Sequence, residues 1–210
     1  MTDFASLSED EIKDFLTQKT ARECACLLET AACDNDTKSI TVILENTEVN
    51  CDRALFYAAS QGHMEAVQLL LPRADPKANN SEALRIACQF GLLDIVKILL
   101  PVSDPQSNNN HPLRVAAGHG HVEVVRYILP FTNPKDVNSA ALLAAAYNQH
   151  WEIADMLFDA SDVDKVRQNL EQSGPGPWQN FENEVHARRQ KIRIENEVSA
   201  VKSASRSKKI

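Results

Sequence analysis

A period of 29 residues runs through the middle of the chain and limits the folds that it can adopt. Leu55, Leu84, Leu113 and Leu142 follow one another at intervals of 29 residues. Other columns keep the same register: an alanine lies three residues after each leucine, a glycine lies seven residues after each of the first three, and an apolar triplet starts fourteen residues after each. A period of this length is typical of a stacked array in which one structural unit is repeated.

Each copy has the pattern of two short helices. In residues 81–105, an apolar stripe at Leu84, Ala87 and Cys88 predicts a first helix that ends at Gly91. The strongly apolar segment that follows predicts a second helix, which a proline stops. Polar residues rich in Asn and Pro then predict a turn to the next copy. Because no copy can bury its apolar face alone, the copies must stack.

The copies resemble the ankyrin repeat. Two stretches carry the resemblance most clearly: Ala54-Leu55-Phe56-Tyr57-Ala58-Ala59-Ser60-Gln61-Gly62-His63-Met64-Glu65-Ala66-Val67 and Gly120-His121-Val122-Glu123-Val124-Val125. The resemblance implies an all-α, ankyrin-type solenoid of helix-turn-helix repeats. The period departs from the usual value of about 33 residues, and the Thr-Pro-Leu-His opening is replaced, for example by Arg53-Ala54-Leu55-Phe56. The missing residues fall between the second helix and the next leucine, so we expect a shortened inter-repeat hairpin.

The array extends beyond its four regular copies. A degenerate copy begins near Ala21, with Leu28 in the leucine column and Asn35 in the glycine column, so we expect about five repeats between residues 21 and 160. Before it, Ser8 and Glu11 predict a capping box at the start of a helix. The expected organisation is a capping helix over 1–20, an ankyrin array with its C-terminal cap over 21–172, and a linker and tail over 173–210.

The C-terminal segment differs from the array in composition and charge. Gly and Pro alternate from Ser173, which predicts a linker, or a turn that lays Trp178 against the last repeat. Residues 181–204 favour a helix, and the last ten residues are expected to lack regular structure. Residues 173–210 hold eight Lys and Arg against four Glu, a net charge of +4. Because the whole chain has a net charge of −7, residues 1–172 have a net charge of −11. An acidic body disfavours nucleic-acid or anionic-membrane binding by the array itself.

No pattern in the sequence indicates an enzyme or a cofactor. We find no Gly-x-Ser-x-Gly, no phosphate-binding glycine loop and no His-Glu-x-x-His. Cys24, Cys26 and Cys33 were considered as zinc ligands, but they fall in an expected helix and no paired histidines follow. We therefore expect no catalytic residue, metal or cofactor, and interpret the five cysteines as buried or half-buried thiols in a reducing compartment.

Three histidines share one column at the start of the second helix. They are His63, His121 and His150. The ankyrin resemblance implies that each makes a hydrogen bond that braces a turn, so we interpret this column as structural.

The ankyrin resemblance also indicates where a partner would bind. In this family the concave side is lined by the first helices and the loops before them. Eight candidate residues, which we call the concave stripe, follow from that register: Phe56, Gln61, Arg85, Gln89, Phe90, Arg114, His119 and Tyr147. Aromatic and arginine side chains are enriched at interface centres, and two arginines could pair with an acidic segment. Phe56 and Leu143 could instead pack between repeats.

Two functional interpretations remain open. The preferred one is an intracellular adaptor or inhibitor that binds a partner protein in its concave groove. The alternative is a protein tethered to nucleic acid or an anionic membrane by its basic residues 188–209, with the repeats as a scaffold.

The expected location follows from the absence of targeting patterns. The acidic N-terminus lacks the apolar run of a signal peptide, and no segment reaches the roughly 20 apolar residues of a membrane span, so we expect a cytoplasmic protein. The short period and Asp-Pro turns also resemble bacterial ankyrin proteins. That resemblance implies an effector secreted into the cytosol of a host cell.

Overall fold

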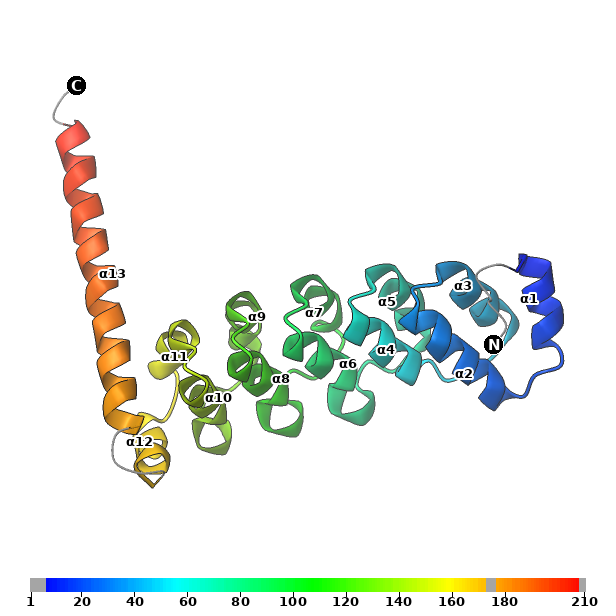
Figure 1. Ribbon diagram of the computed structural model, residues 1–210, viewed down its shortest axis with the longest axis horizontal. Helices are drawn as coiled ribbons and strands as arrows, with labels where there is room; N and C mark the ends of the chain where they lie inside the picture. The colour runs from blue at the N-terminus through cyan, green and yellow to red at the C-terminus, as the bar shows by residue number, and fades with distance from the viewer. Residues whose placement is uncertain (1–6, 173–176, 208–210) are drawn as a thin grey trace.

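The computed structural model describes the backbone of residues 7–172 and 177–207, and their side chains except for residues 137–138, 177–178 and 199–207. Within these ranges the chain is all-α and contains no strand. Figure 1 shows a row of helix pairs that ends in one long C-terminal helix. The expected solenoid of helix-turn-helix repeats is confirmed.

Each of five repeats supplies a first and a second helix. The first helices are α2 (Ala21–Cys33), α4 (Asp52–Gln61), α6 (Ala78–Gln89), α8 (Ser107–Gly118) and α10 (Asp136–Tyr147). The second helices are α3 (Thr37–Asn46), α5 (Met64–Leu70), α7 (Leu93–Leu99), α9 (Val122–Ile128) and α11 (Trp151–Phe158), and the short turns η2 (Leu71–Arg73) and η3 (Leu129–Phe131) follow α5 and α9. The row is flanked by α1 (Glu9–Leu16), α12 (Val163–Gln172) and α13 (Pro177–Ser207).

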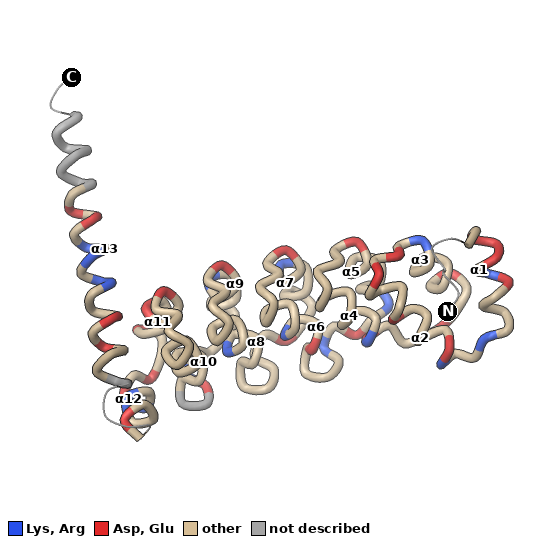
Figure 2. Tube along the Cα trace, viewed as in Figure 1, with Lys and Arg blue, Asp and Glu red and all other residues tan. Residues whose placement is uncertain are grey.

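A column of acidic residues marks the start of four second helices, and Figure 2 shows it along one edge of the row. Its members are Glu65, Asp94, Glu123 and Glu152. Basic side chains on the same helices offset part of this charge. Lys97 Nζ lies 2.9 Å from Asp94, and Arg126 lies 3.8 Å from Glu123 and 3.6 Å from Glu152 of the next repeat.

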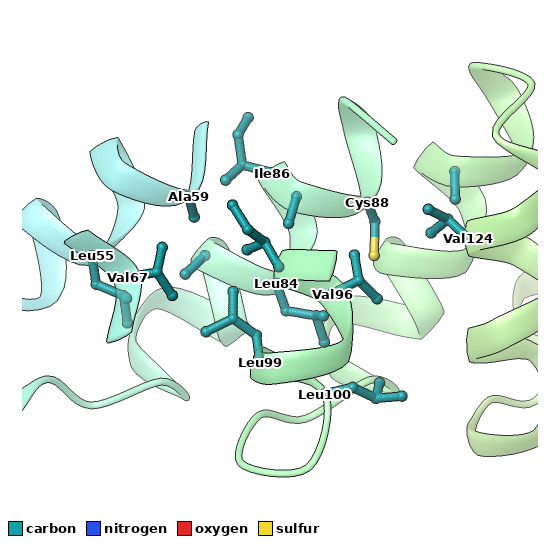
Figure 3. Close-up of a cluster of buried hydrophobic side chains, with 14 of the residues drawn as sticks. Leu55, Ala59, Val67, Leu84, Ile86, Cys88, Val96, Leu99, Leu100 and Val124 are labelled. Carbon is teal, nitrogen blue, oxygen red and sulfur yellow. The ribbon is translucent and has the colours of Figure 1, made fainter. Parts of the chain in front are cut away.

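The leucine column forms the centre of the core. Leu55, Leu84, Leu113 and Leu142 are at most 1 % exposed, so residues 29 apart have equivalent surroundings. Figure 3 shows Leu84 packed with neighbouring buried apolar side chains. The alanine columns of the first helices are also buried, and these helices contact one another more extensively than the second helices do. The first helices therefore form the more closely packed side of the row, which is the side that the ankyrin resemblance assigns as concave.

The turn inside each repeat requires left-handed backbone at one position. Gly62, Gly91 and Gly120 have φ angles of 81°, 71° and 81°. The degenerate first copy and the fifth copy place Asn35 (φ 55°) and Gln149 (φ 60°) at the same point. The turn is therefore kept where glycine is absent, at a position that asparagine accepts more readily than glutamine.

The turns between repeats contain short left-handed segments instead of a hairpin. Residues 79–81 and 108–110 have φ angles between 48° and 60°. Five of these six residues are asparagine, which tolerates this conformation better than most side chains. The inter-repeat connection is therefore compact, as the missing residues led us to expect.

A hydrogen bond from backbone to side chain closes each regular repeat on itself. The backbone N–H of Asp104 donates to Ser81 Oγ at 2.8 Å. Equivalent bonds, at 2.7 to 2.9 Å, run from Asp75 to Asp52, from Asn133 to Asn110 and from Asp162 to Ser139. The side chains in this column differ, but each presents an oxygen that accepts from the turn after the second helix.

The N-terminal cap forms as the sequence predicts. Ser8 Oγ accepts from the backbone N–H of Glu11, whose carboxylate accepts from the backbone N–H of Ser8 at 2.7 Å. Ile12 and Leu16 are buried where α1 packs against α3. This contact covers the apolar end of the row.

At the other end, α12 and the base of α13 take the places of a further helix pair. α12 packs against α10 as a first helix would, and α13 packs against both α11 and α12. Phe181 and Val185 are 1 % exposed at this contact. Arg189 pairs with Asp155 and Asp159. The start of the tail is therefore part of the folded array.

The limits of the tail differ in detail from expectation. α13 begins at Pro177 and continues to Ser207, into the last ten residues for which the composition predicts no regular structure. The expected linker at 173–176 and the side chain of Trp178 lie outside the described residues.

Candidate functional site

The first helices carry the concave stripe along one side of the row. Phe56 and Gln61 lie on α4, and Arg85 and Gln89 lie on α6. The other members follow in order: Phe90 directly after α6, Arg114 on α8, His119 directly after α8, and Tyr147 at the end of α10. The eight predicted residues therefore lie on the first helices of four consecutive repeats, or directly after them.

The members of the stripe differ in exposure. Phe90 is 53 % exposed and Tyr147 is 54 % exposed, and Gln61 and His119 are also exposed. Arg85, Gln89 and Arg114 are half-buried. Two large aromatic side chains thus remain accessible on the concave side.

Phe56 belongs partly to the core. It is half-buried against the apolar cluster, and its ring makes an edge-on contact with Tyr57 at a centroid distance of 5.4 Å. Leu143 is likewise half-buried against the core. Both side chains therefore pack partly against the core, as the alternative interpretation of these two residues expects.

The two arginines have different surroundings. Arg85 Nη2 lies 3.1 Å from Glu82 on the same helix, and both side chains are partly exposed. Arg114 makes no ion pair with the described part of the chain. Burial lowers the pKa of His111, and the positive charges of Arg114 and Arg85 lower it further. His111 therefore lies within the electrostatic reach of both arginines.

His111 is a neighbour of the two arginines that the residue columns of the sequence did not indicate. It lies three residues before Arg114, a spacing that places two side chains on neighbouring positions of one helix face. The spacing is a usable signal, but His111 lies two residues before the leucine and so falls outside the columns that define the concave stripe.

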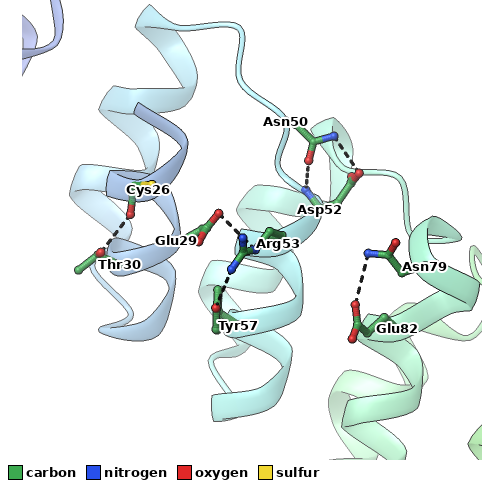
Figure 4. Close-up of polar contacts among 9 residues, drawn as sticks. All are labelled: Cys26, Glu29, Thr30, Asn50, Asp52, Arg53, Tyr57, Asn79 and Glu82. Carbon is green, nitrogen blue, oxygen red and sulfur yellow. Dashed lines mark hydrogen bonds and ion pairs between the residues drawn. The ribbon is translucent and has the colours of Figure 1, made fainter. Parts of the chain in front are cut away.

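Polar contacts lie on α2, on α4 and on the turn before α4, near the N-terminal end of the row (Figure 4). Arg53 donates to the Tyr57 hydroxyl at 3.1 Å and lies 3.5 Å from Glu29 of the preceding repeat. Asp52 accepts a hydrogen bond from the Asn50 side chain at 2.8 Å. Because Arg53 already has a carboxylate and a hydroxyl beside it, the Arg114 region is the more available cationic surface.

The histidine column joins neighbouring repeats. The Nε2 atoms of His63, His121 and His150 lie 2.9, 2.8 and 3.1 Å from backbone carbonyl oxygens of the repeat before. The acceptors are, in the same order, Cys33, Gln89 and Gly118. The turn-bracing bond is confirmed, and it extends from one repeat to the preceding one.

The cysteines of α2 do not share one environment. Cys24 is buried and Cys33 is half-buried, as we expected of the thiols, but Cys26 is exposed, so that expectation is wrong for one of the five. In the described ranges, no group of three or more His, Cys, Asp or Glu side chains could hold a metal ion. Burial raises the pKa of Cys88 on α6 to about 12. None of the described helices combines the length and apolar character needed to cross a bilayer.

Comparison with known protein families agrees with this architecture. A family model described as ankyrin repeats in three copies matches residues 28–109 and 101–169. The two matches together cover about two thirds of the chain and include the whole concave stripe. None of the curated proteins compared with the chain gave a match.

Proposed function

The chain belongs to the ankyrin-repeat family, and on that premise we propose that its concave stripe binds an extended acidic segment of a partner protein. Ankyrin repeats generally mediate protein–protein interaction, and regular helix pairs present a continuous side-chain surface suited to this task. An adaptor, an inhibitor and an effector secreted into a host cell would all use this same surface. We assign no catalytic role to any residue.

The exposure of aromatic rings beside an unpaired arginine carries the proposal. Phe90 and Tyr147 are more than half exposed, although burial of such rings is favourable by about 2 kcal/mol each. Arg114, without an ion pair in the described part of the chain, lies on the helix between them. Aromatic and arginine side chains of this kind dominate the binding energy of protein interfaces.

The acidic character of the partner follows from the charges of the stripe. Arg114 and Arg85 are the two cations of the concave stripe, and their charges help to lower the pKa of nearby His111, whereas the starts of the second helices carry the acidic column. A carboxylate of the partner could pair with Arg114 through two parallel hydrogen bonds. An acidic segment is therefore expected to prefer the concave side to the opposite one.

The basic tail is the weaker candidate for the binding function. Arg188 lies 3.2 Å from Glu152, and Arg189 is bound by Asp155 and Asp159. These two arginines hold α13 against the last repeat, which leaves them less available to phosphates. Tethering to nucleic acid or membrane would have to rest on basic residues nearer the C-terminus.

Affinity capture from a cell lysate with matched variants tests the proposal. One variant combines Arg85→Ala, Phe90→Ala and Arg114→Ala. The control combines Lys97→Ala, Arg126→Ala and Phe131→Ala, which removes two cations and one exposed ring outside the stripe. We expect the stripe variant to lose partners that the control retains. Equal capture by both would contradict the proposal.

A truncation separates the two candidate functions. Removal of residues 199–210 keeps Phe181 and Val185, which cover the last repeat, so the array should remain folded. Retained partner capture would favour the concave stripe. Loss of binding after this truncation, together with steep weakening by salt, would favour the tail.

A further inference from the structure

A hollow of about 480 Å³ lies where the last repeat meets α13. The turn between α10 and α11 forms one wall, and α12 and α13 form the other. The described residues that line it are Ala146, Tyr147, Gln149, Trp151, Leu170, Asn180, Asn183 and Glu184. Tyr147 belongs to the concave stripe as well, so the hollow continues that surface toward the C-terminal cap.

The docking of α13 positions one wall of the hollow. The Phe181 ring lies 6.4 Å from Trp151 and 5.9 Å from Phe158 between centroids, which anchors the base of the helix. Asn180, Asn183 and Glu184 have the i, i+3 and i+4 spacing of one helix face. With Phe181 buried, that neighbouring face is held beside Trp151.

The chemistry of the lining is suited to a cation. Glu184 is an exposed carboxylate that makes no ion pair with the described part of the chain. No lysine or arginine occurs among the described lining residues, and the remaining polar groups are neutral amides and a phenol. The rings of Tyr147 and Trp151 add electron-rich faces, which attract a positive charge. A carboxylate in a lining without lysine or arginine disfavours an anionic ligand.

We propose that this hollow binds an arginine side chain of the same partner segment that occupies the concave stripe. A guanidinium group can pair with the Glu184 carboxylate while it stacks on an aromatic ring, which a compact ammonium group does less well. The proposal rests on the proposed function, because the partner's backbone must pass Tyr147. It also gives the order of charges along the partner segment: acidic residues lie against Arg85 and Arg114, and an arginine lies further along the array, against α13.

Selection from a display library of random 16-residue peptides tests both proposals separately. The full chain is used as bait, in parallel with its Glu184→Gln, Glu184→Lys and Arg85→Ala/Arg114→Ala variants. We expect peptides selected by the native chain to carry acidic residues and an arginine at a fixed separation. Glu184→Gln should abolish the arginine preference and keep the acidic one, and Glu184→Lys should disfavour arginine at that position.

A double-mutant cycle then measures the contact itself. For one selected peptide, the Kd is measured for arginine and glutamine at the selected position, each against the native chain and Glu184→Gln. We expect either change alone to weaken binding by about 2- to 5-fold and the second change to add little, as for an exposed charge pair.

The outcomes distinguish the two proposals. Acidic peptides without an arginine preference, or an arginine insensitive to Glu184→Gln, would overturn the arginine site and leave the concave stripe intact. Selection unaffected by Arg85→Ala/Arg114→Ala would overturn the acidic-segment proposal, even if arginine still depended on Glu184. Equal preference for lysine would contradict the assignment to guanidinium.

Discussion

The Nε2 atom of His121 lies 2.8 Å from the carbonyl oxygen of Gln89, so the start of α9 is hydrogen-bonded to the end of α6, the first helix of the repeat before. The same ring lies against Gly91, where an added Cβ would be 2.4 Å from His121 Nδ1. The contact joins two repeats through one polar bond and one close approach. It offers direct tests of how the repeats are held together.

Replacing the bonded histidine should destabilise the array. His121→Ala leaves the half-buried Gln89 carbonyl without this partner and removes the ring's packing, so the free energy of unfolding should fall by about 1 to 3 kcal/mol. His119→Ala is the control, because His119 is exposed and its ring, which stacks on that of His121 at a centroid distance of 6.2 Å, is hydrogen-bonded to the Val115 carbonyl of the same repeat and not to the repeat before. Urea unfolding measures both. Equal losses would contradict a bracing role for His121.

A methyl group on the adjacent glycine should also be unfavourable. Gly91→Ala places a side chain at φ 71° and against the His121 ring, so we expect a loss of more than about 1 kcal/mol. In Gly118→Ala the nearest atom to the new Cβ is 3.5 Å away and the residue lies in α8, so stability should be unchanged or higher by up to about 1 kcal/mol. Thermal unfolding of the two variants measures both changes in stability. A tolerated Gly91→Ala would refute this packing.

Core and stripe substitutions should separate folding from binding. Leu99 is fully buried, so Leu99→Ala should cost about 2 to 5 kcal/mol of stability. Phe90→Ala should change stability by less than about 0.5 kcal/mol, yet weaken partner binding by about 1 kcal/mol or more. Denaturant unfolding measures the change in stability, and a binding titration measures the change in partner affinity. Loss of folding by Phe90→Ala would show that the ring is structural.

The five free thiols should react at very different rates. Burial raises the pKa of Cys88 to about 12, so its thiolate is scarce at pH 8, and the side chain is also fully buried. Cys26 is exposed on α2. Mass spectrometry after brief iodoacetamide treatment should find Cys26 modified and Cys88 unmodified until the chain is unfolded in urea. Rapid modification of native Cys88 would contradict the packing of α6.

The repeat register was sufficient to predict the core, because identical spacing places Leu55, Leu84 and their equivalents in identical surroundings. It also located the left-handed turn, even where Asn35 and Gln149 replace glycine. The column of hydrogen-bond acceptors was not predicted because its residues vary between Asp, Ser and Asn. What these positions share is a side-chain oxygen, which comparison by residue identity overlooks.

The docking of α13 could not be predicted from its own sequence. Phe181 and Val185 are two apolar residues in a charged segment, too few to form a recognisable stripe. Their partners lie on α11, and the bonds from Arg189 to Asp155 and Asp159 join residues 34 and 30 positions apart. Residue spacing within the tail carries no information about such contacts. The hollow beside Glu184 was unforeseen for the same reason.

Hydroxyl-radical footprinting of the partner complex tests the central claim most directly. Phe90 and Tyr147 on the concave stripe are 53 % and 54 % exposed, and Phe131, in the turn after α9, provides a matched control at 51 %. We expect partner binding to suppress oxidation of Phe90 and Tyr147 and to leave Phe131 unchanged. Protection of Phe131 with unaltered oxidation of the two stripe residues would show that the partner binds elsewhere.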